Sequence, residues 1–322
     1  MMKTFFGFSI IASLWIGAVA GCAAPRSQPN IYAKLKESSV EILVNGRLAG
    51  AGSVVDAKGH VLIANHMAPG EGAKIEAQSV NLGRHPLRIV ARDRGHDLVL
   101  LKLPARKEAY RHLSLAKDQP KAGQSVYLFG APVFRHHVMV RGTVARDRTT
   151  FEFYDGAFRE IIHISAISPI GTSGGPWVNA AGELVGVQSA AMTINGAHQG
   201  IAYAAPLSSL KGLLDKKKPI QSATMQTGVE EIWGQDPGFI SKLPKDFRGL
   251  VVRQLRGNGV AAKAGLKEWD IIVAIEGKPI ERTDDLLRLI RNRKPGQTIR
   301  LQATDREGKN SRELIIKLVP VN

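Results

Sequence analysis

The stretch "SPIGTSGGPWVN", residues 168–179, places three glycines around a single serine, Ser173. Glycine in ordinary secondary structure costs about 0.5–1 kcal/mol relative to alanine, so this density needs a reason. A glycine-rich turn is one explanation. The other is a serine nucleophile held beside backbone N–H groups that stabilise a developing oxyanion. The choice between them depends on what the rest of the chain supplies.

Composition is typical of a globular protein with much β structure. The 322 residues leave room for two domains, and 44% hydrophobic with 22% charged residues is typical of a folded chain. The 33 glycines and 16 prolines indicate many turns. A formal net charge of +16 favours anionic partners, whether nucleic acid, anionic lipid or acidic envelope polymers.

The N-terminal sequence "MMKTFFGFSIIASLWIGAVAGC" has the pattern of a secretory signal. Its apolar run, residues 5–20, is shorter than the ~20 residues of a spanning helix. "VAGC" ends at Cys22, the only cysteine, and resembles a bacterial lipobox, in which that cysteine is lipidated. A plain signal peptide with an incidental cysteine is the alternative. Ala23, in place of aspartate, implies outer-membrane sorting in a Gram-negative cell.

These features predict a lipid-anchored protein of the cell envelope, on the outer membrane and facing the periplasm. Such a protein rarely meets nucleic acid, so we expect no nucleic-acid partner. The basic excess is better explained by an anionic membrane surface or cell-wall polymer, because each well-placed Lys or Arg contributes about 1 kcal/mol there.

From residue 40 to residue 206, short β-branched apolar runs alternate with turn residues, which predicts an all-β sandwich or barrel. The runs include "VEILV", "DLVLLKL", "SVYLFGAP" and "GIAYAAP". The segment "LSSLKGLLDKKK", residues 207–218, reads as a helix that closes this region. A polar linker is expected to follow.

After residue 228 the pattern predicts a small α+β unit. "RGLVVRQL" and "DIIVAIEGKPI" are expected strands, and residues 297–319 an expected hairpin. "TDDLLRLIRNRKPG" predicts a helix with Thr283 as its N-cap and acidic residues in its first turn. A unit of this size can fold alone.

A serine nucleophile needs a base, and the base needs an orienting carboxylate. "GTSGG" also fits the nucleophile elbow of α/β-hydrolases, whose order is Ser, acid, His. Here only His198 follows Ser173, and only Glu183 lies between them. The 25 residues that separate the serine from this histidine cannot hold the intervening elements of such a fold.

Chymotrypsin-like proteases have their triad in the order His, Asp, Ser, and this chain offers the same order. "VLIANHMA" supplies His66 and "ARDRGHDLVLLKL" supplies Asp97, both before Ser173. Each side chain lies at the end of an apolar strand. Asp93 is a rival acid, but its flanking arginines favour a solvated loop charge. His136, His137 and His163 form no metal-ligand spacing, and we expect no metal and no cofactor.

The successive blocks "GSVVDAKGHVLIANHMA", "RIVARDRGHDLVLLKL" and "IGTSGGPWVNAAGELVGVQSA" resemble the HtrA/Deg family of envelope serine proteases. The block "GLVVRQLRGNGVAAKAGLKEWDIIVAIEGKPI" resembles the PDZ domain that follows the protease in that family. The resemblance covers about residues 35–320. It implies a mainly β fold, in which a double β-barrel, trypsin-like protease domain precedes a small α+β PDZ domain. The expected division is signal peptide 1–21, tether 22–34, protease domain 35–215, linker 216–227 and PDZ domain 228–322.

By this resemblance His66 is the general base, Asp97 orients it and Ser173 attacks the scissile carbonyl. The N–H groups of Gly171 and Ser173 form the oxyanion hole, which Thr172 lines. Gly174 and Gly175 are expected to leave space for the substrate strand.

The sequence departs from the family pattern near both catalytic blocks. The histidine block reads "IANHMA", and the usual "INPGNSGGP" is replaced by "ISPIGTSGGP", which puts the S1 pocket in question. The expected S1 neighbours are all apolar and predict small or medium aliphatic P1 residues: Ile167, Ile170, Ala190 and Ala191.

The PDZ domains of the family bind peptide C-termini by strand addition, with a backbone nest for the carboxylate. "EEIWGQD" is expected to supply that loop through Trp233, Gly234 and Gln235. An apolar residue is more usual at position 235. Leu286 and Ile290 are expected at the groove or in the core beneath it.

The leading hypothesis is a serine endopeptidase that cleaves misfolded or signal-bearing polypeptides. A PDZ-bearing peptide binder or holdase without catalysis is the second, and a binder of envelope polymers is the third. The family resemblance also implies a homotrimer, to which Tyr32 could contribute.

Overall fold

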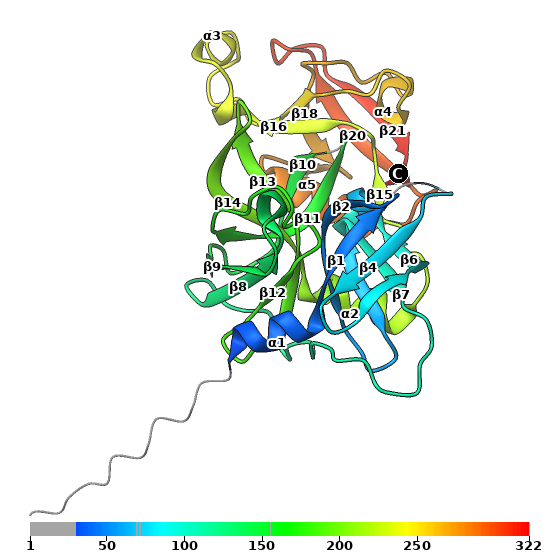
Figure 1. Ribbon diagram of the computed structural model, residues 1–322. Coiled ribbons are helices and arrows are strands. Elements are labelled where there is room, and N and C mark those ends of the chain that lie inside the picture. The colour runs from blue at the N-terminus through cyan, green and yellow to red at the C-terminus, as the bar shows by residue number, and fades with distance from the viewer. Residues whose placement is uncertain (1–29, 69, 71, 155, 322) are drawn as a thin grey trace, which may run out of the picture.

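The computed structural model describes residues 30–321 except 69, 71 and 155. The chain is mainly β and forms two units (Figure 1). The N-terminal unit holds two seven-stranded antiparallel sheets, and the C-terminal unit lies above them in that view. The expected fold class is confirmed.

The first sheet has the order β5-β4-β1-β2-β3-β7-β6. The hairpin between β1 and β2 turns at Asn45 and Gly46, both with positive φ, as a two-residue hairpin turn requires. The central strands β3 and β7 are almost fully buried, which explains their continuous apolar runs. The strands are β1 (Ser39–Val44), β2 (Arg47–Val54), β3 (His60–Ala64), β4 (Ile75–Ser79), β5 (Gly83–Pro86), β6 (Arg88–Asp93) and β7 (Leu98–Lys102).

The second sheet has the order β10-β11-β14-β13-β12-β8-β9, and an additional pairing of β11 with β9 closes it into a barrel. Because β11 makes the closure, β10 remains outside the barrel wall. The strands are β8 (Ser125–Gly130), β9 (Val138–Val144), β10 (Thr150–Tyr154), β11 (Ala157–Ser165), β12 (Pro176–Val178), β13 (Leu184–Ile194) and β14 (Ala197–Pro206).

One apolar cluster lies between the two sheets. It joins Leu62 and Leu98 of the first sheet to Phe129 and Val187 of the second. Helix α2 (Leu207–Lys216) adds Leu210 to the same cluster, which confirms the expected closing helix. Helix α1 (Ile31–Ser38) begins after Asn30, whose side-chain oxygen accepts the N–H of Ala33 at 3.0 Å.

The segment 216–227, expected as a polar linker, is partly built into the C-terminal unit. Strand β15 (Ala223–Thr224) pairs with β22 (Val319–Pro320) near the end of the chain. Ala223 and Met225 are buried there, and two apolar side chains are too few to change the polar character of the sequence.

The C-terminal unit is a five-strand path, β16-β17-β18-β20-β21, with β19 beside β18. Its bounds are β16 (Gly228–Glu231), β17 (Leu250–Arg253), β18 (Ile271–Ile275), β19 (Lys278–Pro279), β20 (Thr298–Thr304), β21 (Arg312–Lys317), α3 (Pro237–Ile240), α4 (Val260–Lys263) and α5 (Thr283–Arg291).

The expected N-cap of α5 is wrong by one residue. Arg282 occupies the cap position without a side-chain hydrogen bond, and Thr283 is the first helical residue. Glu231 of β16 takes over the role, because its Oε1 accepts the N–H of Thr283 at 3.1 Å. A carboxylate at a helix N-terminus also complements the helix dipole.

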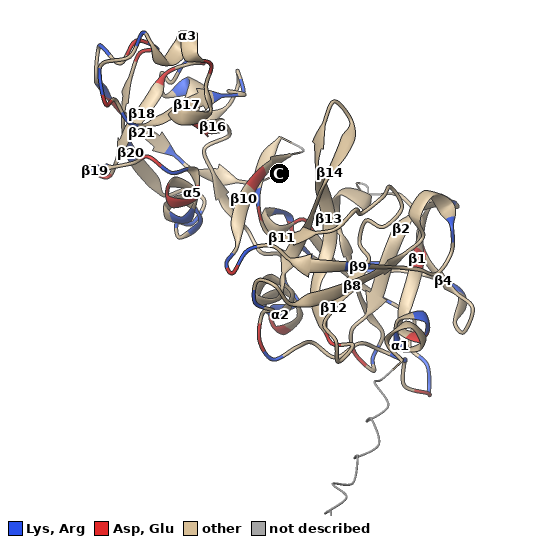
Figure 2. Ribbon diagram, turned by 90° about the vertical axis from the view of Figure 1, so that its left-hand side faces the viewer, with Lys and Arg blue, Asp and Glu red and all other residues tan. Residues whose placement is uncertain are grey.

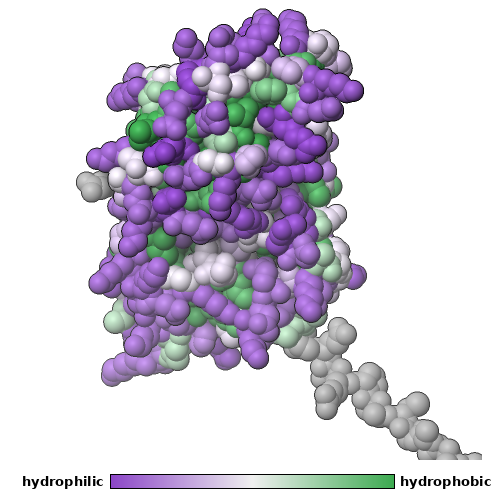
Figure 3. Space-filling model, turned by 180° about the vertical axis from the view of Figure 1, so that it is seen from behind, coloured by the Kyte–Doolittle hydropathy of each residue, from purple (hydrophilic) through white to green (hydrophobic). Residues whose placement is uncertain are grey.

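Figure 2 shows α5 near β10 at the junction of the two units, with ribbon segments coloured for basic and acidic residues there. The face seen in Figure 3 is largely hydrophilic, with scattered apolar patches. Among the residues that the structure describes, no helix is both long and apolar enough to cross a bilayer.

Candidate active site

His66 and Asp97 lie where two paired strands of the first sheet end. A 3-10 helix, η1 (Asn65–Met67), follows β3 and carries His66. Another, η2 (Arg94–His96), precedes Asp97, which adopts left-handed φ of 54° before β7 begins. Ala64 and Leu98 are direct partners in the sheet. The pairing of β3 with β7 therefore brings together two residues that are 31 positions apart.

The carboxylate of Asp97 holds His66 at two points. Its Oδ2 is 2.8 Å from His66 Nδ1, and its Oδ1 accepts the backbone N–H of His66 at 2.9 Å. Asp97 is only 2% exposed, whereas the His66 side chain is 35% exposed. A buried carboxylate thus fixes an imidazole whose other ring nitrogen, Nε2, points away from it.

The Ser173 loop is packed against the segment that carries His66. The carbonyl of Ser173 accepts the N–H of Ala51 at 2.8 Å. A methyl group built on Gly174 would lie 3.1 Å from the Ala64 nitrogen and 3.0 Å from the Met67 sulfur. Ala64 and Met67 flank His66 on either side. The structure therefore brings the serine loop beside the histidine segment.

The three glycines around Ser173 are required by close backbone contacts. A Cβ would lie 2.3 Å from the Ala131 oxygen at Gly171 and 2.4 Å from the Phe129 oxygen at Gly175. At Gly174 the nearest atom would be the Ala51 oxygen, at 2.2 Å. Close packing against the protein's own carbonyls explains why Gly174 and Gly175 lack side chains, and room for a substrate strand stays a prediction.

Some backbone N–H groups of this loop make hydrogen bonds within the protein, and others do not. The N–H and the hydroxyl of Thr172 both donate to the Pro169 oxygen, at 3.1 and 2.8 Å. Among the described residues, no hydrogen bond uses the N–H of Gly171 or of Ser173. These two amides are the donors that remain for an anionic ligand.

Two regions of the chain match known domain families. Residues 50–187 match the trypsin-like peptidase domain, and residues 220–318 match the PDZ domain. The chain joins a trypsin-like peptidase domain to a PDZ domain. The PDZ match includes the segment 220–227, which contains β15.

Curated relatives align with most of this chain. A probable periplasmic serine endoprotease DegP-like from Pseudomonas fluorescens is 28% identical over 283 residues, covering 84% of this chain and 56% of the relative. A relative of the same description from Brucella suis is 27% identical over 262 residues, covering 77% and 48%. The chain therefore spans about half the length of the curated relatives it matches.

Solved structures with the same fold include the HtrA-type protease AlgW with a decapeptide. It aligns with a TM-score of 0.64 at 19% identity and covers 92% of this chain and 99% of that one. A serine endoprotease from Yersinia pestis aligns with a TM-score of 0.61 at 20% identity, covering 93% and 100%. At this identity the likeness establishes the fold, and it agrees with the two-barrel and PDZ organisation.

The expected S1 neighbours are distributed unevenly in the peptidase domain. Ile170 is 85% exposed and lies on the surface, while Ala190 and Ala191 are half-buried on β13. Beside them, His198 Nε2 lies 3.3 Å from the Ser168 hydroxyl, and Gly200 N–H donates to His198 Nδ1 at 2.9 Å. Burial lowers the pKa of His198. The sequence analysis missed this histidine as a neighbour of the loop.

Asp93 is buried, which contradicts the expected solvated loop charge. It lies 2.8 Å from His96 Nδ1, and His96 Nε2 lies 3.4 Å from Glu160. Burial acts to lower the pKa of His96, but Asp93 and then Glu160 outweigh it and raise the pKa to about 9. Asp93 therefore pairs with His96 in place of His66.

A cavity of about 1010 Å³ lies between the β10–β11 hairpin and the PDZ domain. Trp233, Gly234 and Gln235, the predicted carboxylate loop, are among the residues that line it, and Trp233 is 75% exposed. From α5 the lining comes from polar side chains, because Leu286 is buried in the core and Ile290 lines a separate small pocket with Leu287. Gln235, at a position where an apolar residue is more usual, donates to Glu230 at 2.9 Å.

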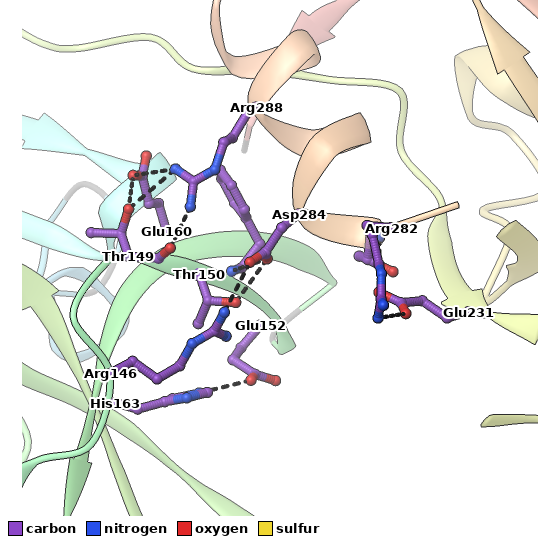
Figure 4. Close-up of polar contacts among 12 residues, drawn as sticks. Arg146, Thr149, Thr150, Glu152, Glu160, His163, Glu231, Arg282, Asp284 and Arg288 are labelled. Atoms are coloured by element: carbon purple, nitrogen blue, oxygen red, sulfur yellow. Dashed lines mark hydrogen bonds and ion pairs between the residues drawn. The ribbon is translucent and has the colours of Figure 1, made fainter. Parts of the chain in front are cut away.

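The hairpin and α5 are joined by polar contacts (Figure 4). Asp284 accepts hydrogen bonds from the Thr150 hydroxyl at 2.7 Å and from the Phe151 N–H at 3.3 Å, and it pairs with Arg146 at 3.4 Å. Arg288 donates to the Thr149 carbonyl. Phe151 and Phe158 of the hairpin belong to the apolar cluster of the PDZ domain.

One further residue, Ser189, contacts the histidine–aspartate pair, and Tyr154 contacts Ser189; sequence reasoning missed both. The Ser189 hydroxyl donates to Asp97 Oδ2, and the Tyr154 hydroxyl lies 2.7 Å from Ser189 Oγ. No motif signals them, because they are 92 and 57 positions away from Asp97 in sequence.

Proposed function

We propose that this protein is a serine endopeptidase of the bacterial cell envelope that works through His66, Asp97 and Ser173. The observation that carries the proposal is that the buried carboxylate of Asp97 contacts His66 twice, at 2.8 and 2.9 Å. The glycine-rich loop that carries Ser173 packs beside this pair. In this proposal Ser173 supplies the nucleophile, His66 the base and Asp97 the orienting carboxylate of acyl transfer, all within the region that matches a trypsin-like peptidase domain.

In the proposed reaction, His66 Nε2 takes the proton of the Ser173 hydroxyl as its oxygen attacks the scissile carbonyl. Asp97 holds the imidazole in one tautomer and stabilises the imidazolium that forms. The N–H groups of Gly171 and Ser173 stabilise the oxyanion, and losing one such donor typically costs about 10²–10³ in kcat. His66 then gives its proton to the leaving amine.

We propose that the substrates are unfolded or signal-bearing polypeptides and that the PDZ domain binds peptide C-termini or exposed peptides. The cavity beside β16 and α5 supports the second part, because an open strand edge next to a helix is the usual site of strand addition. The apolar Ile167, Ala190 and Ala191 support a preference for small or medium aliphatic P1 residues.

The proposed location is the periplasmic side of the outer membrane, with lipid attached at Cys22, which lies outside the described residues. A homotrimer is proposed as well. Tyr32 donates to the His137 carbonyl at 3.1 Å and packs edge-on against Phe129, so part of its surface is already engaged within the chain.

The deciding experiment compares the intact protein with its Ser173→Ala variant. Fluorescein-labelled casein reports proteolysis, and a fluorophosphonate probe reports an activated serine. We expect the wild type to cleave casein and to take up one label per chain, and the variant to do neither. Ser241→Ala, an exposed serine of the PDZ domain, is the matched control and should behave as wild type.

Casein cleavage by pure Ser173→Ala would overturn the proposal. A wild-type protein that takes no label and cleaves nothing, with or without C-terminal peptides, would favour the alternative of a peptide binder or holdase. Cleavage of a peptide library mainly after Lys or Arg would contradict the P1 preference alone.

A further inference from the structure

The carboxylate of Asp97 has a second side-chain donor besides His66. Ser189 lies on β13 where the register with β14 shifts between Gln188 and Ala190. Such a bulge leaves one residue without a strand partner and turns its side chain. The Ser189 hydroxyl is thereby directed to Asp97 Oδ2, the same oxygen that contacts His66 Nδ1. Ser189 is buried, so no water competes for it.

The hydroxyl of Tyr154 extends this contact by one step. It lies 2.7 Å from Ser189 Oγ, a good hydrogen-bond length for two hydroxyl groups. Burial, and then the Asp97 charge, raise the pKa of Tyr154, so the phenol stays protonated. The hydroxyl proton of Ser189 is already donated in the hydrogen bond to Asp97. The phenol must therefore be the donor to Ser189.

We propose that Tyr154 is a positioning residue for the catalytic acid and that it acts on Asp97 through Ser189. This inference rests on the proposed function, because it assigns Tyr154 a part in the same reaction. The two hydroxyls form a relay of hydrogen bonds, Tyr154 to Ser189 to Asp97, and no proton has to move along it.

Aromatic neighbours hold the ring of Tyr154 in place. The ring of Tyr154 stacks on Tyr203 of β14, with centroids 6.1 Å apart and planes 26° apart. Tyr203 in turn lies 5.3 Å from the His163 ring, and His163 Nε2 lies 2.8 Å from Glu152. Tyr154 is therefore fixed by the barrel wall, although it lies at the end of β10, outside the barrel.

The relay has a defined role in the reaction. When His66 becomes an imidazolium, Asp97 must keep both its position and its charge. Consecutive hydrogen bonds polarise one another in a buried site, so a donor two steps away still strengthens the Ser189 contact. Without Tyr154, Ser189 could turn its hydroxyl elsewhere, and Asp97 would lose one of the groups that orient it.

The test measures the rate of fluorophosphonate acylation and the kinetics of casein cleavage in full-length Tyr154→Phe. We expect acylation and kcat to fall about threefold to tenfold with KM unchanged, which is the range of one neutral hydrogen bond at about 1.36 kcal/mol per factor of ten. Labelling stoichiometry counts the folded sites, so partial unfolding is separated from a slower site.

Tyr203→Phe is the matched control, because it removes the hydroxyl of a neighbouring tyrosine in the same stack. That hydroxyl faces Glu152 and does not contact Ser189 in the described structure. We expect its acylation rate to stay within about twofold of the wild type.

A double-mutant cycle with Ser189→Ala decides whether the effect passes through Ser189. The relay predicts that Tyr154→Phe changes nothing further once Ser189 is alanine. It also predicts that Tyr154→Phe moves the half-maximal pH of acylation upward, since a carboxylate with fewer donors holds a protonated imidazole more strongly. A structural role alone would move neither.

Additive effects in the cycle, or a Tyr154→Phe variant with wild-type rate and pH profile, would overturn the relay. Failure of the proposed function looks different, because Ser173→Ala would then keep its activity or the wild type would take no label. An inert Ser173→Ala beside a fully active Tyr154→Phe discards the relay and leaves the endopeptidase proposal intact.

Discussion

At the scale of single residues, the glycines around Ser173 show how one residue type is required for different reasons. Gly171 and Gly174 have positive φ of 96° and 76°, whereas Gly175 is required only by the carbonyl that lies against it. The loop is thus clamped between the two barrels through the Ala51, Phe129 and Ala131 carbonyls. Its shape is set by backbone contacts and leaves little tolerance for a side chain.

Gly174→Ala should therefore destabilise the protein and abolish labelling of Ser173. The left-handed backbone costs an L-residue about 1–2 kcal/mol, and the clash with the Ala51 carbonyl adds about 1–3 kcal/mol. Gly196→Ala is the matched control, because Gly196 has φ of 79° and open space around it. Urea unfolding measures both. Equal losses in the two variants would contradict the clash.

The half-buried His96, with its two acidic partners, predicts a pH dependence of stability. Its folded pKa of about 9 is above the usual 6.5, so its contribution is complete below pH 6.5 and is lost as pH rises through 9. Glu160 behaves oppositely. Burial acts to raise its pKa, but hydrogen bonds from His96 and Thr149 hold it at about 2, so its contribution is lost only as pH falls from 4.5 through 2.

We expect the urea midpoint of the wild type to decrease as the pH is raised from 6.5 to 9.5. This decrease corresponds to a loss of at most about 3 kcal/mol in the free energy of unfolding. His96→Gln should flatten that slope, and the exposed His112→Gln should leave it as in the wild type. A wild-type midpoint that does not change over this range would exclude the ion pairs of His96 as a stabilising contribution.

At the scale of elements, the β10–β11 hairpin is the part of the peptidase domain that reaches the PDZ domain. It can do so because β10 is excluded when β11 closes the barrel onto β9. Its polar backbone meets the first turn of α5 at Asp284, and its aromatic side chains Phe151 and Phe158 enter the PDZ core. The same hairpin ends at Tyr154.

Asp284→Ala should destabilise the contact between the two domains by about 1–3 kcal/mol. The substitution removes a carboxylate that accepts hydrogen bonds from Thr150 and Phe151 and pairs with Arg146. Asp285→Ala is the matched control: it lies in the same first turn and has a similar effect on the helix dipole, but it is exposed. Limited proteolysis of the 216–227 segment measures the loosening. Equal cleavage of both variants would show that Asp284 does not hold the junction.

At the scale of the whole molecule, the two domains share one apolar cluster. Phe151 and Phe158 are 5% and 8% exposed only because PDZ residues such as Met225 and Leu287 cover them. A chain that ends after Lys216 would expose both rings, and large aromatic side chains contribute much of the energy of such contacts.

We expect the truncated chain to bind an apolar dye and to aggregate more readily than the full chain. Replacing both rings, in the variant Phe151→Ser and Phe158→Ser, should reduce dye binding by the truncated chain. Dye fluorescence and light scattering at matched concentration measure the effect. A truncated chain that binds no dye and scatters no more light than the full chain would mean that the hairpin folds away when the PDZ domain is missing.

The sequence could predict what short segments encode. Strand-rich runs, the closing helix and the order His66, Asp97, Ser173 all rest on local patterns, and the first two agree with the structure. The sequence could not predict that Asp93 would be buried, since its neighbours are arginines. It placed the cap of α5 on Thr283, because a carboxylate supplied by Glu231, 52 positions earlier, leaves no local trace.

By itself, then, the sequence determined the two domain types and the three side chains of the proposed triad, because each is written in a contiguous motif whose backbone requirements are local. Only the tertiary structure decided which side chains meet. It sets the contacts of Asp97 with His66 and the proposed relay from Tyr154 through Ser189. It also places a hairpin of the peptidase domain in the PDZ core. Those depend on barrel closure and strand register, which arise from the packing of segments far apart in the chain.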